Sequence, residues 1–555
     1  MNFFDRISLF SEPVVAKPLD RGVCVIAQSG TVACNVLFSQ RHLPLGYVFS
    51  TGNQSSITSI DLAHFALRDS RVSAIGIYME SVGAPTALRD LACAARNQGV
   101  PIVVLKTGRS EAARSITLSH TGAMSGSDRN LDVLMQRLGI GRCDSLAEFV
   151  ETLKLLHVHG PLSGNRLALS GGSGGDMAIA SDLLQKLDVQ LPDVGKETRI
   201  KLGQLLGNQV SIGNPFDFQT RTWHDEANLC QMFSAIQDGD ADLYGFFLDH
   251  PDSSSIEHLE PYELPVRAFL AATRQTGAKA FVASTMAEST PSSIAEMALR
   301  SGVAPMQGMW ETFRAFEIAH HIGSAWAQFS PPTLGRRAAS ASVYCIGEFE
   351  SKQVLMSAGI KTPAAIQVNA KEAAKMAETI GYPVAMKVSS EHILHKTEVN
   401  GLALNVDTLD KALKEAKRLG EITEYLLIEE MIDDGVAELI IGAKVDPDFG
   451  TIVLVGAGGI LAELVEDSVL LLPPFSEEEV LAGLKTLRAY RLLSGYRGRP
   501  KGDLDALISA VMAVAELALD PTRAIVEIEI NPLIVRPSGR GAVAVDSLLI
   551  CRRKE

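Results

Sequence analysis

Residues 23–40, VCVIAQSGTVACNVLFSQ, decide the fold of the first part of this chain. Residues 23–27 are a short apolar run of the kind that forms a buried strand. A turn of small and polar residues follows at 28–31, and residues 32–40 continue with helix-like spacing. Further β-like runs lie at 74–79 and 102–105, with a helix-like stretch at 85–97 between them. This alternation predicts a parallel sheet with helices on its faces.

The same arrangement returns in residues 167–187, LALSGGSGGDMAIASDLLQKL. A β-like run at 167–169 leads into a Ser/Gly turn at 170–175, and a helix-like run follows from Asp176. Later β-like runs lie at 243–248 and 280–283. We interpret the two stretches as a weak internal repeat, which predicts two doubly wound α/β domains.

The composition changes at residues 326–341, which contain two consecutive prolines and many small residues. Such a segment predicts a linker. Helix-like and strand-like stretches beyond it no longer alternate regularly, which indicates an α+β domain. We therefore expect a residual N-terminal segment and three domains. Their ranges are 1–20, 21–160, 161–325 and 342–555.

Length and charge restrict the class of protein. A chain of 555 residues has room for about three to four domains. Its net charge of −14 argues against broad nucleic-acid binding, which requires a basic face. The seven cysteines are scattered and form no C-x-x-C pair, which favours a reducing cytoplasm over a disulfide framework or a zinc site. The sequence has no apolar run long enough to span a bilayer, and its start does not resemble a signal peptide.

Residues 119–127, SHTGAMSGS, place His120 among small, hydroxylated and flexible residues. Such a loop can direct several N–H groups and hydroxyls at one tetrahedral anion. A histidine there can also carry a phosphoryl group covalently. The alternative is an ordinary solvated histidine, and composition alone favours that alternative.

The two Ser/Gly turns are candidate phosphate sites because each lies where a strand passes into a helix. The N-terminus of a helix offers unpaired N–H groups and a partial positive charge. Ligands of doubly wound sheets bind beyond the carboxyl ends of the strands. Glycine-rich turns are also common for steric reasons alone. The candidate residues are Ser29, Gly30, Thr31, Gly172 and Ser173.

A strand-like stretch near the end of the chain carries oxygen ligands on one face. Glu527, Glu529 and Asn531 alternate along it, so their side chains point the same way, and Asp546 adds a further oxygen. Magnesium takes a few such ligands and leaves its other positions to nucleotide phosphates and water. The alternative is a solvated strand face that ends in an Asn-Pro turn.

Three further features are weak evidence of a functional site when each is taken alone. Lys387 ends an apolar, strand-like run and can either reach nucleotide phosphates or extend to solvent. His395 lies in a polar stretch and is a second candidate for phosphoryl transfer, although a surface histidine is the simpler interpretation. The Gly-rich turn at 456–459 gains weight only beside Lys387 and the carboxylate strand.

Together these residues resemble the NDP-forming, or ADP-forming, acyl-CoA synthetases, relatives of succinyl-CoA synthetase and of ADP-forming acetate–CoA ligase. The motifs occur in the family's order and extend over nearly the whole chain. Each motif alone is weak evidence for this family, whereas the whole set in this order is specific to it. They are SGT at 29–31, HTGA at 120–123, NPFD at 214–217, HK at 395–396, GAGG at 456–459, GYRG at 495–498 and EINPL at 529–533.

The resemblance implies two flavodoxin-like domains followed by an ATP-grasp domain, and it implies a role for each site residue. His120 resembles the phosphorylated catalytic histidine, Glu80 the glutamate that orients it, and His395 the second, shuttling histidine. Ser29 resembles a phosphate-binding serine, and Lys387 the nucleotide-binding lysine. The other implied residues are Glu429 and Glu430 at an adenine hinge, Gly458 and Gly459 at the nucleotide, and Asn531 and Asp546 as magnesium ligands.

The implied reaction converts a carboxylic acid, ATP and CoA into acyl-CoA, ADP and phosphate, through an acyl phosphate and a phosphohistidine. Members of the family usually begin with a Rossmann-type CoA-binding domain, and residues 1–20 resemble only the tail of one. We therefore expect CoA to bind on a separate polypeptide or on a preceding part of a longer chain. Relatives assemble as oligomers, so an oligomer is expected as well.

Two other functions compete with the ligase. The first is a regulatory protein that binds nucleotide without catalysis, which the missing CoA-binding domain favours. The presence of His120, Lys387, Asn531 and Asp546 together favours chemistry. The second is a related protein acyltransferase, which needs an added acetyltransferase domain that we do not find in the sequence. The residues do not indicate which carboxylic acid is used.

Overall fold

The computed structural model describes residues 1–9, 19–81, 83–110, 128–207, 210–220, 223–251, 260–335, 342–390, 399–459 and 467–553. The chain divides into two compact units, Met1–Pro331 and Pro332–Glu555. The division falls within residues 326–341, where the linker is expected. No helix among the described residues has the length and apolar character needed to cross a membrane.

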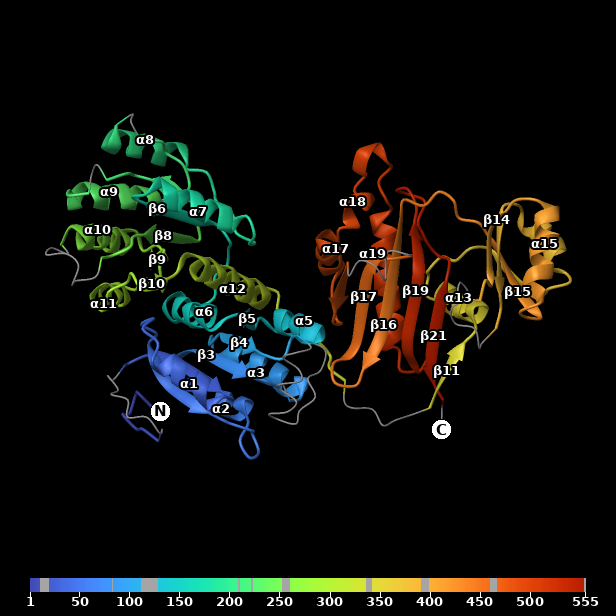
Figure 1. The fold of residues 1–555 in the computed structure, drawn as a ribbon, viewed down its shortest axis with the longest axis horizontal. Helices are drawn as coiled ribbons and strands as arrows, with labels where there is room; N and C mark the ends of the chain where they lie inside the picture. Colours follow the sequence, from blue (N-terminus) through green and yellow to red (C-terminus); the bar gives the residue numbers. More distant parts are fainter. Residues whose placement is uncertain are drawn as a thin grey trace. The chain divides into compact units, whose positions relative to one another are not determined.

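The first half of unit 1 is a parallel five-stranded sheet in the order β2-β1-β3-β4-β5 (Figure 1). This order, with the first strand second in the sheet, is that of flavodoxin-like folds. The strands are β1 (Gly22–Ala27), β2 (Leu45–Ser50), β3 (Val72–Met79), β4 (Ile102–Lys106) and β5 (Gly141–Cys143). The helices are α1 (Gly30–Leu37), α2 (Ser59–Ala66), α3 (Pro85–Asn97), α5 (Asp128–Leu138) and α6 (Leu146–His159).

The second half of unit 1 repeats this topology in the order β7-β6-β8-β9-β10. The prediction of two doubly wound α/β domains is thereby confirmed. The strands are β6 (Leu167–Gly171), β7 (Phe216–Asp217), β8 (Leu243–Phe247), β9 (Ala280–Ser284) and β10 (Ala304–Gln307). The helices are α7 (Gly174–Leu184), α8 (Lys196–Leu206), α9 (Glu226–Gln237), α10 (Glu260–Thr276), α11 (Ser292–Arg300) and α12 (Met309–Ala327).

Helix α6 lies between the two sheets of unit 1 and packs on both (Figure 1). It contacts β3 and β4 of the first sheet, β10 of the second sheet, and α12. Every residue from position 148 to 156 is buried, as is typical of a helix that is surrounded on all sides. The two flavodoxin-like halves therefore share one hydrophobic core.

A buried polar network connects the same two halves. The Lys154 ammonium on α6 lies 3.0 Å from Glu151 Oε2 and donates to the Arg41 carbonyl at 2.6 Å and to Gln307 Oε1 at 3.4 Å. Arg41 in turn donates to Glu151 Oε1 at 3.1 Å and to the Gln307 carbonyl at 2.8 Å. The side chains of Glu151 and Lys154 have no exposed surface. Every charge in the network is therefore paired, as burial requires.

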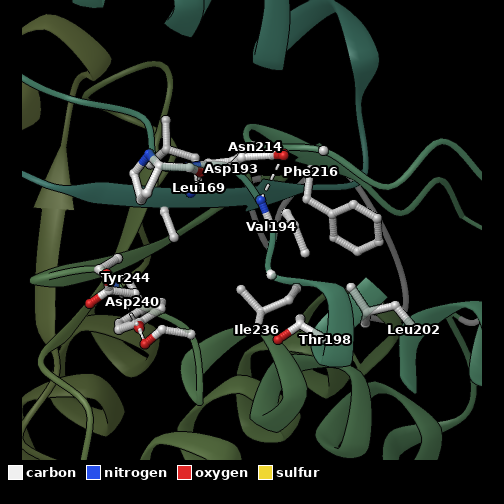
Figure 2. Close-up of a pocket in the computed structure, with 16 residues that line it drawn as sticks. Leu169, Asp193, Val194, Thr198, Leu202, Asn214, Phe216, Ile236, Asp240 and Tyr244 are labelled. Carbon is white, nitrogen blue, oxygen red and sulfur yellow. Dashed lines mark hydrogen bonds between the residues drawn. The ribbon is translucent and has the colours of Figure 1, made fainter. Parts of the chain in front are cut away.

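Asn214, in the NPFD motif, stabilises the start of the second sheet (Figure 2). Its Oδ1 accepts a hydrogen bond from the Leu169 N–H at 3.0 Å, and its Nδ2 donates to the carbonyls of Leu167 and Pro192, each at 2.9 Å. The neighbouring cavity measures about 40 Å³ and has mainly apolar walls, including Leu202 and Phe216. Asn214 thus acts on the backbone of β6 and of the segment before α8.

Unit 2 contains an antiparallel seven-stranded sheet and a four-stranded sheet. The large sheet has the order β11-β21-β19-β16-β17-β18, with β20 paired to β19. Its strands are β11 (Val343–Ile346), β16 (Ala437–Asp446), β17 (Gly450–Ala457), β18 (Ser468–Leu471), β19 (Ile525–Val535), β20 (Ala542–Ala544) and β21 (Ser547–Arg552). The small sheet, in the order β12-β15-β13-β14, contains β12 (Ala365–Asn369), β13 (Val384–Val388), β14 (Leu402–Val406) and β15 (Tyr425–Glu430).

Helices cover both sheets of unit 2. Helices α14 (Ala373–Ile380) and α15 (Leu409–Gly420) pack on the small sheet, and α17 (Glu477–Thr486) and α19 (Leu504–Leu519) pack on the large one. Helix α13 (Glu348–Ser357) packs on β21, and the short α18 (Tyr490–Leu493) follows α17. The prediction of an α+β arrangement after residue 342 is confirmed.

Replacing Lys154 with methionine leaves Glu151 buried with one charge partner fewer. Arg41 still pairs with Glu151, but the Arg41 carbonyl and Gln307 Oε1 lose their donor, so we expect the free energy of unfolding of unit 1 to fall by about 1–3 kcal/mol. Urea unfolding followed by tryptophan fluorescence measures unit 1 selectively, because Trp223, Trp310 and Trp326 all lie in it. Lys201→Met, at an exposed lysine, is the control and should change the value by less than about 0.5 kcal/mol. Equal stability of the two variants would contradict the role of the network.

Replacing Asn214 with alanine leaves backbone groups at the start of β6 without partners. Each buried group left unpaired costs about 1–3 kcal/mol, so we expect unit 1 to lose at least about 2 kcal/mol in the same measurement. Asn53→Ala removes an exposed amide and should have little effect. A loss at position 214 no larger than at position 53 would show that the three bonds contribute nothing net.

Candidate functional site

The Ser29 turn lies at the topological switch point of the first sheet. Strands β1 and β3 are neighbours, with Ala27 paired to Tyr78, and the chain leaves β1 directly into α1. The Ser29 hydroxyl accepts a hydrogen bond from the Val32 N–H at 3.3 Å, so Ser29 is the N-cap of α1. Gly30 and Thr31 form the first turn of the helix. This is the place where doubly wound sheets bind anionic ligands.

Gln28 fixes the backbone that follows β3, where Glu80 lies. Its Oε1 accepts hydrogen bonds from the backbone N–H groups of Glu80 and, at 3.2 Å, of Ser81. Gln28 is only 7% exposed. Sequence reasoning named Glu80 but assigned no role to Gln28. A polar side chain directly after a buried strand needs a partner, and that signal would have identified it.

The second sheet repeats the turn with one difference. The pair Gly171 and Phe247 corresponds to Ala27 and Tyr78, so Ser173 takes the place of Ser29. Ser173 is the N-cap of α7 and accepts a hydrogen bond from the Asp176 N–H at 3.3 Å.

Gly172 is restricted to glycine by an aromatic neighbour. A Cβ at Gly172 would lie 2.8 Å from Trp223 Cζ3, which is too close for any larger residue to fit without displacing the ring. The Gly172 turn is therefore packed against Trp223 on one side.

The N-termini of α1 and α7 differ in whether a carboxylate lies beside them. A Cβ at Gly174, the first residue of α7, would lie 2.9 Å from Asp217 Oδ2. The corresponding neighbour of Gly30 is the neutral Ser50, whose Oγ would lie 3.7 Å from such a Cβ. A carboxylate beside a helix N-terminus repels a second anion. The N-terminus of α1 is therefore the stronger anion site of the two.

The two candidate histidines, His120 and His395, lie in residues 111–127 and 391–398, outside the described residues. Their predicted roles remain predictions.

Lys387 lies in a buried cluster of charges in unit 2. Its ammonium is 2.8 Å from Glu348 Oε1, 2.9 Å from Glu429 Oε2 and 2.5 Å from the Val545 carbonyl. Lys352 on α13 donates to the same three residues, at 2.8 Å to Glu348 Oε1, at 2.8 Å to the Val545 carbonyl, and to Glu429 Oε1. The cluster connects β13 and β15 of the small sheet with α13 and with the segment before β21 of the large sheet.

The two lysines differ in their pKa values. Burial lowers the pKa of Lys352, and the nearby Lys387 ammonium acts in the same direction. Burial acts on Lys387 too, but the carboxylates of Glu348, Glu429 and Asp546 outweigh it and raise the pKa of Lys387 well above its usual value. Lys387 is thus a permanent cation close to Asp546.

The Gly-rich turn meets the predicted magnesium ligands. The Gly459 N–H donates to Asn531 Oδ1 at 3.0 Å, and the Asn531 N–H donates to the Asp546 carbonyl at 3.3 Å. The Gly458 N–H donates to the Glu438 carbonyl at 2.9 Å. Four residues that sequence reasoning named separately, Gly458, Gly459, Asn531 and Asp546, therefore belong to one region, with Lys387 beside it.

The donors in this region fit magnesium. Within the described parts of the chain, no three His, Cys, Asp or Glu side chains converge on one point. An amide oxygen and a carboxylate are hard ligands, and the phosphates of a nucleotide and water complete an octahedron around Mg²⁺. Asn531 and Asp546 therefore suit a metal ion that arrives with its nucleotide.

Adjacent residues of β15 point to opposite faces, and this separates Glu429 from Glu430. Glu429 is 1% exposed and pairs with the lysines, whereas Glu430 is exposed and lines a pocket of about 360 Å³ with Ile360 and Ile432. The structure thus places the two glutamates that resemble the adenine hinge in different surroundings. Sequence reasoning missed Glu348 and Lys352, because an i, i+4 pair on a helix usually lies on a surface.

Comparison with known proteins gives two matching family models. Residues 337–550 match an ATP-grasp domain, and residues 20–156 match a succinyl-CoA ligase like flavodoxin domain. Together the two models include the Ser29 turn, Glu80 and the whole lysine cluster.

Curated relatives match over the same regions. The chain is 29% identical to a trans-feruloyl-CoA synthase from an unidentified prokaryote, over all of this chain and 80% of the relative. It is 28% identical to the ADP-forming acetate–CoA ligase I of Archaeoglobus fulgidus, over 94% of this chain and 77% of the relative. The beta subunit of ADP-forming acetate–CoA ligase II of Pyrococcus furiosus is 34% identical, over 37% of this chain and 91% of that subunit. The chain therefore belongs to the NDP-forming acyl-CoA synthetase family, whose members are acid–thiol ligases.

Proposed function

We propose that this chain forms an acyl-CoA from a carboxylic acid, ATP and CoA, and that His120 carries the phosphoryl group. The observation that carries the proposal is the gathering of Lys387, Gly459, Asn531 and Asp546 in one region of unit 2. A lysine, a Gly-rich turn and two oxygen ligands are the groups that a magnesium–nucleotide complex needs. The similarity to ligases over the whole chain supports catalysis rather than binding alone.

The proposed sequence has three transfers. An imidazole nitrogen of His120 takes the γ-phosphoryl group of ATP, and the bond to the ADP oxygen breaks. In the acyl site, a carboxylate oxygen of the acid takes the phosphoryl group from the histidine and forms an acyl phosphate. The CoA thiol then attacks the acyl carbon, loses its proton and releases phosphate. A covalent carrier replaces one difficult transfer by two easier ones.

Residues of the first sheet act on the phosphohistidine in this proposal. The N-terminus of α1, with Ser29, Gly30 and Thr31, binds the phosphoryl oxygens, and Glu80 orients the imidazole. Gln28 fixes the backbone of Glu80 and so determines where that carboxylate lies. Gly172 and Ser173 offer a second, weaker anion site because Asp217 lies beside α7. His395 is a second carrier that exchanges the phosphoryl group with His120, and each exchange breaks one N–P bond as the other forms.

In the nucleotide site, Lys387 binds phosphate oxygens, and the turn of Gly458 and Gly459 lies beside them, where the Gly459 N–H holds the Asn531 side chain. Glu429 orients Lys387, and Glu430 lies at the hinge. Asn531 and Asp546 would hold magnesium, which would supply positive charge to offset that of the phosphates.

We further propose that a CoA-binding domain, on a separate polypeptide or on a preceding part of a longer chain, completes the enzyme and that the working enzyme is an oligomer. The resemblance supports both statements. A cytoplasmic location is proposed on the ground that all seven cysteines are free thiols, as expected in a reducing compartment.

Incubating the purified chain with γ-labelled ATP and Mg²⁺ tests the proposal. We expect an acid-labile label that maps to His120, that disappears in His120→Asn, and that does not form when EDTA removes the metal. His224→Asn, at an exposed histidine of unit 1, is the matched control and should keep the label.

Two results would change the proposal. A chain that binds ATP and takes no label would favour a regulatory nucleotide-binding protein. Label that survives in His120→Asn and disappears in His395→Asn would make His395 the first phosphoryl acceptor.

A further inference from the structure

Lys352 contacts the same partners as Lys387. It is 1% exposed, and its ammonium donates to Glu348, Glu429 and the Val545 carbonyl, the same three residues that Lys387 contacts. The two lysines are on different elements, Lys352 on α13 and Lys387 on β13. The two ammonium groups and the two carboxylates that are in direct contact balance in charge, and Asp546 lies near Lys387.

The cluster uses all the hydrogen-bonding capacity of Lys387. An ammonium has three N–H donors, and Lys387 has three acceptors within 2.9 Å. To contact a phosphate, Lys387 must therefore leave at least one of these acceptors. A glutamate that lost its only cation in this buried place would carry an uncompensated charge, which is strongly unfavourable.

Lys352 removes this obstacle, because it already donates to both glutamates. We propose that Lys352 is a positioning residue for nucleotide binding, which keeps Glu348 and Glu429 paired while Lys387 turns to the phosphates of ATP. This inference rests on the proposed function, since it assigns Lys387 to the phosphates.

The test is the Kd of the full chain for a non-hydrolysable ATP analogue with Mg²⁺, measured by calorimetry. Lys352→Met leaves one lysine with two carboxylates, and the excess negative charge retains Lys387 in the cluster. We expect the Kd to rise about tenfold or more. Lys352→Arg keeps the positive charge, so its Kd should stay within about threefold of the wild-type value.

A second substitution separates charge balance from simple loss of structure. In Lys352→Met, Glu348→Gln the charges in direct contact balance again, and we expect the Kd to return to within about threefold of the wild type. If Lys352 had a structural role alone, the Kd of the double variant would be at least as high as that of the single variant, because the double variant lacks one more buried ionic contact. Lys154→Met, which removes a buried lysine from unit 1, controls for general destabilisation and should leave the Kd unchanged.

Each outcome has a definite meaning. An unchanged Kd in Lys352→Met, or a double variant at least as weak as the single one, would overturn the inference and leave the proposed function standing. Absence of nucleotide binding by the wild-type chain would overturn both. If Lys352→Met does not fold, Glu348→Gln alone decides, because weaker retention of Lys387 should lower the Kd, and a rise would overturn the inference.

Discussion

Buried lysine–glutamate clusters connect two sheets in each unit of this protein, and every carboxylate in them contacts two cations. In unit 1 the cluster around Lys154 and Glu151 connects the loop after α1 with β10. In unit 2 the cluster around Lys352, Lys387, Glu348 and Glu429 connects the small sheet with α13 and the segment before β21. A buried charge must be paired, so each cluster restricts which faces can meet. The apolar core around each cluster stabilises the fold, and the paired charges determine which faces pack together.

The same constraint explains why the clusters differ in function. In unit 1, each N–H of Lys154 has an acceptor from a different element, and nothing in the proposed chemistry requires it to move. In unit 2, the second lysine makes the first one dispensable to the carboxylates. A cluster with a spare cation can release one lysine to a phosphate without exposing an unpaired glutamate. Glu151 also contacts two cations, but the proposed chemistry gives neither of them a second role, whereas it assigns Lys387 to the phosphates.

The repeated flavodoxin-like topology gives unit 1 two equivalent crevices, and single residues then make them unequal. Ser29 and Ser173 cap the helices that leave the first strand of each sheet. Among the described residues, the neighbour of Gly174 at the second helix is the carboxylate of Asp217, whereas the neighbour of Gly30 at the first helix is the neutral Ser50. Topology places an anion site at the switch point of any such sheet, and the residue on the neighbouring strand determines its strength.

The sequence by itself determined the elements and the motifs, because both are local. The apolar run at 23–27, the Ser29 turn and the helix after it are encoded within about twenty residues, and so is their repeat at 167–187. Lys387 ends an apolar run and can extend to solvent or reach phosphates, and the family resemblance favours the phosphates; Asn531 alternates with Glu529 on one strand face.

Only the tertiary structure decided which of these residues meet. It showed that Gln28 fixes Glu80, that Glu429 and Glu430 face opposite ways, and that Glu348 and Lys352 are buried. A Glu–Lys pair four residues apart on a helix has the same local pattern on a surface and in a core. The difference arises from which sheet packs against it, and that depends on contacts between residues distant in the chain.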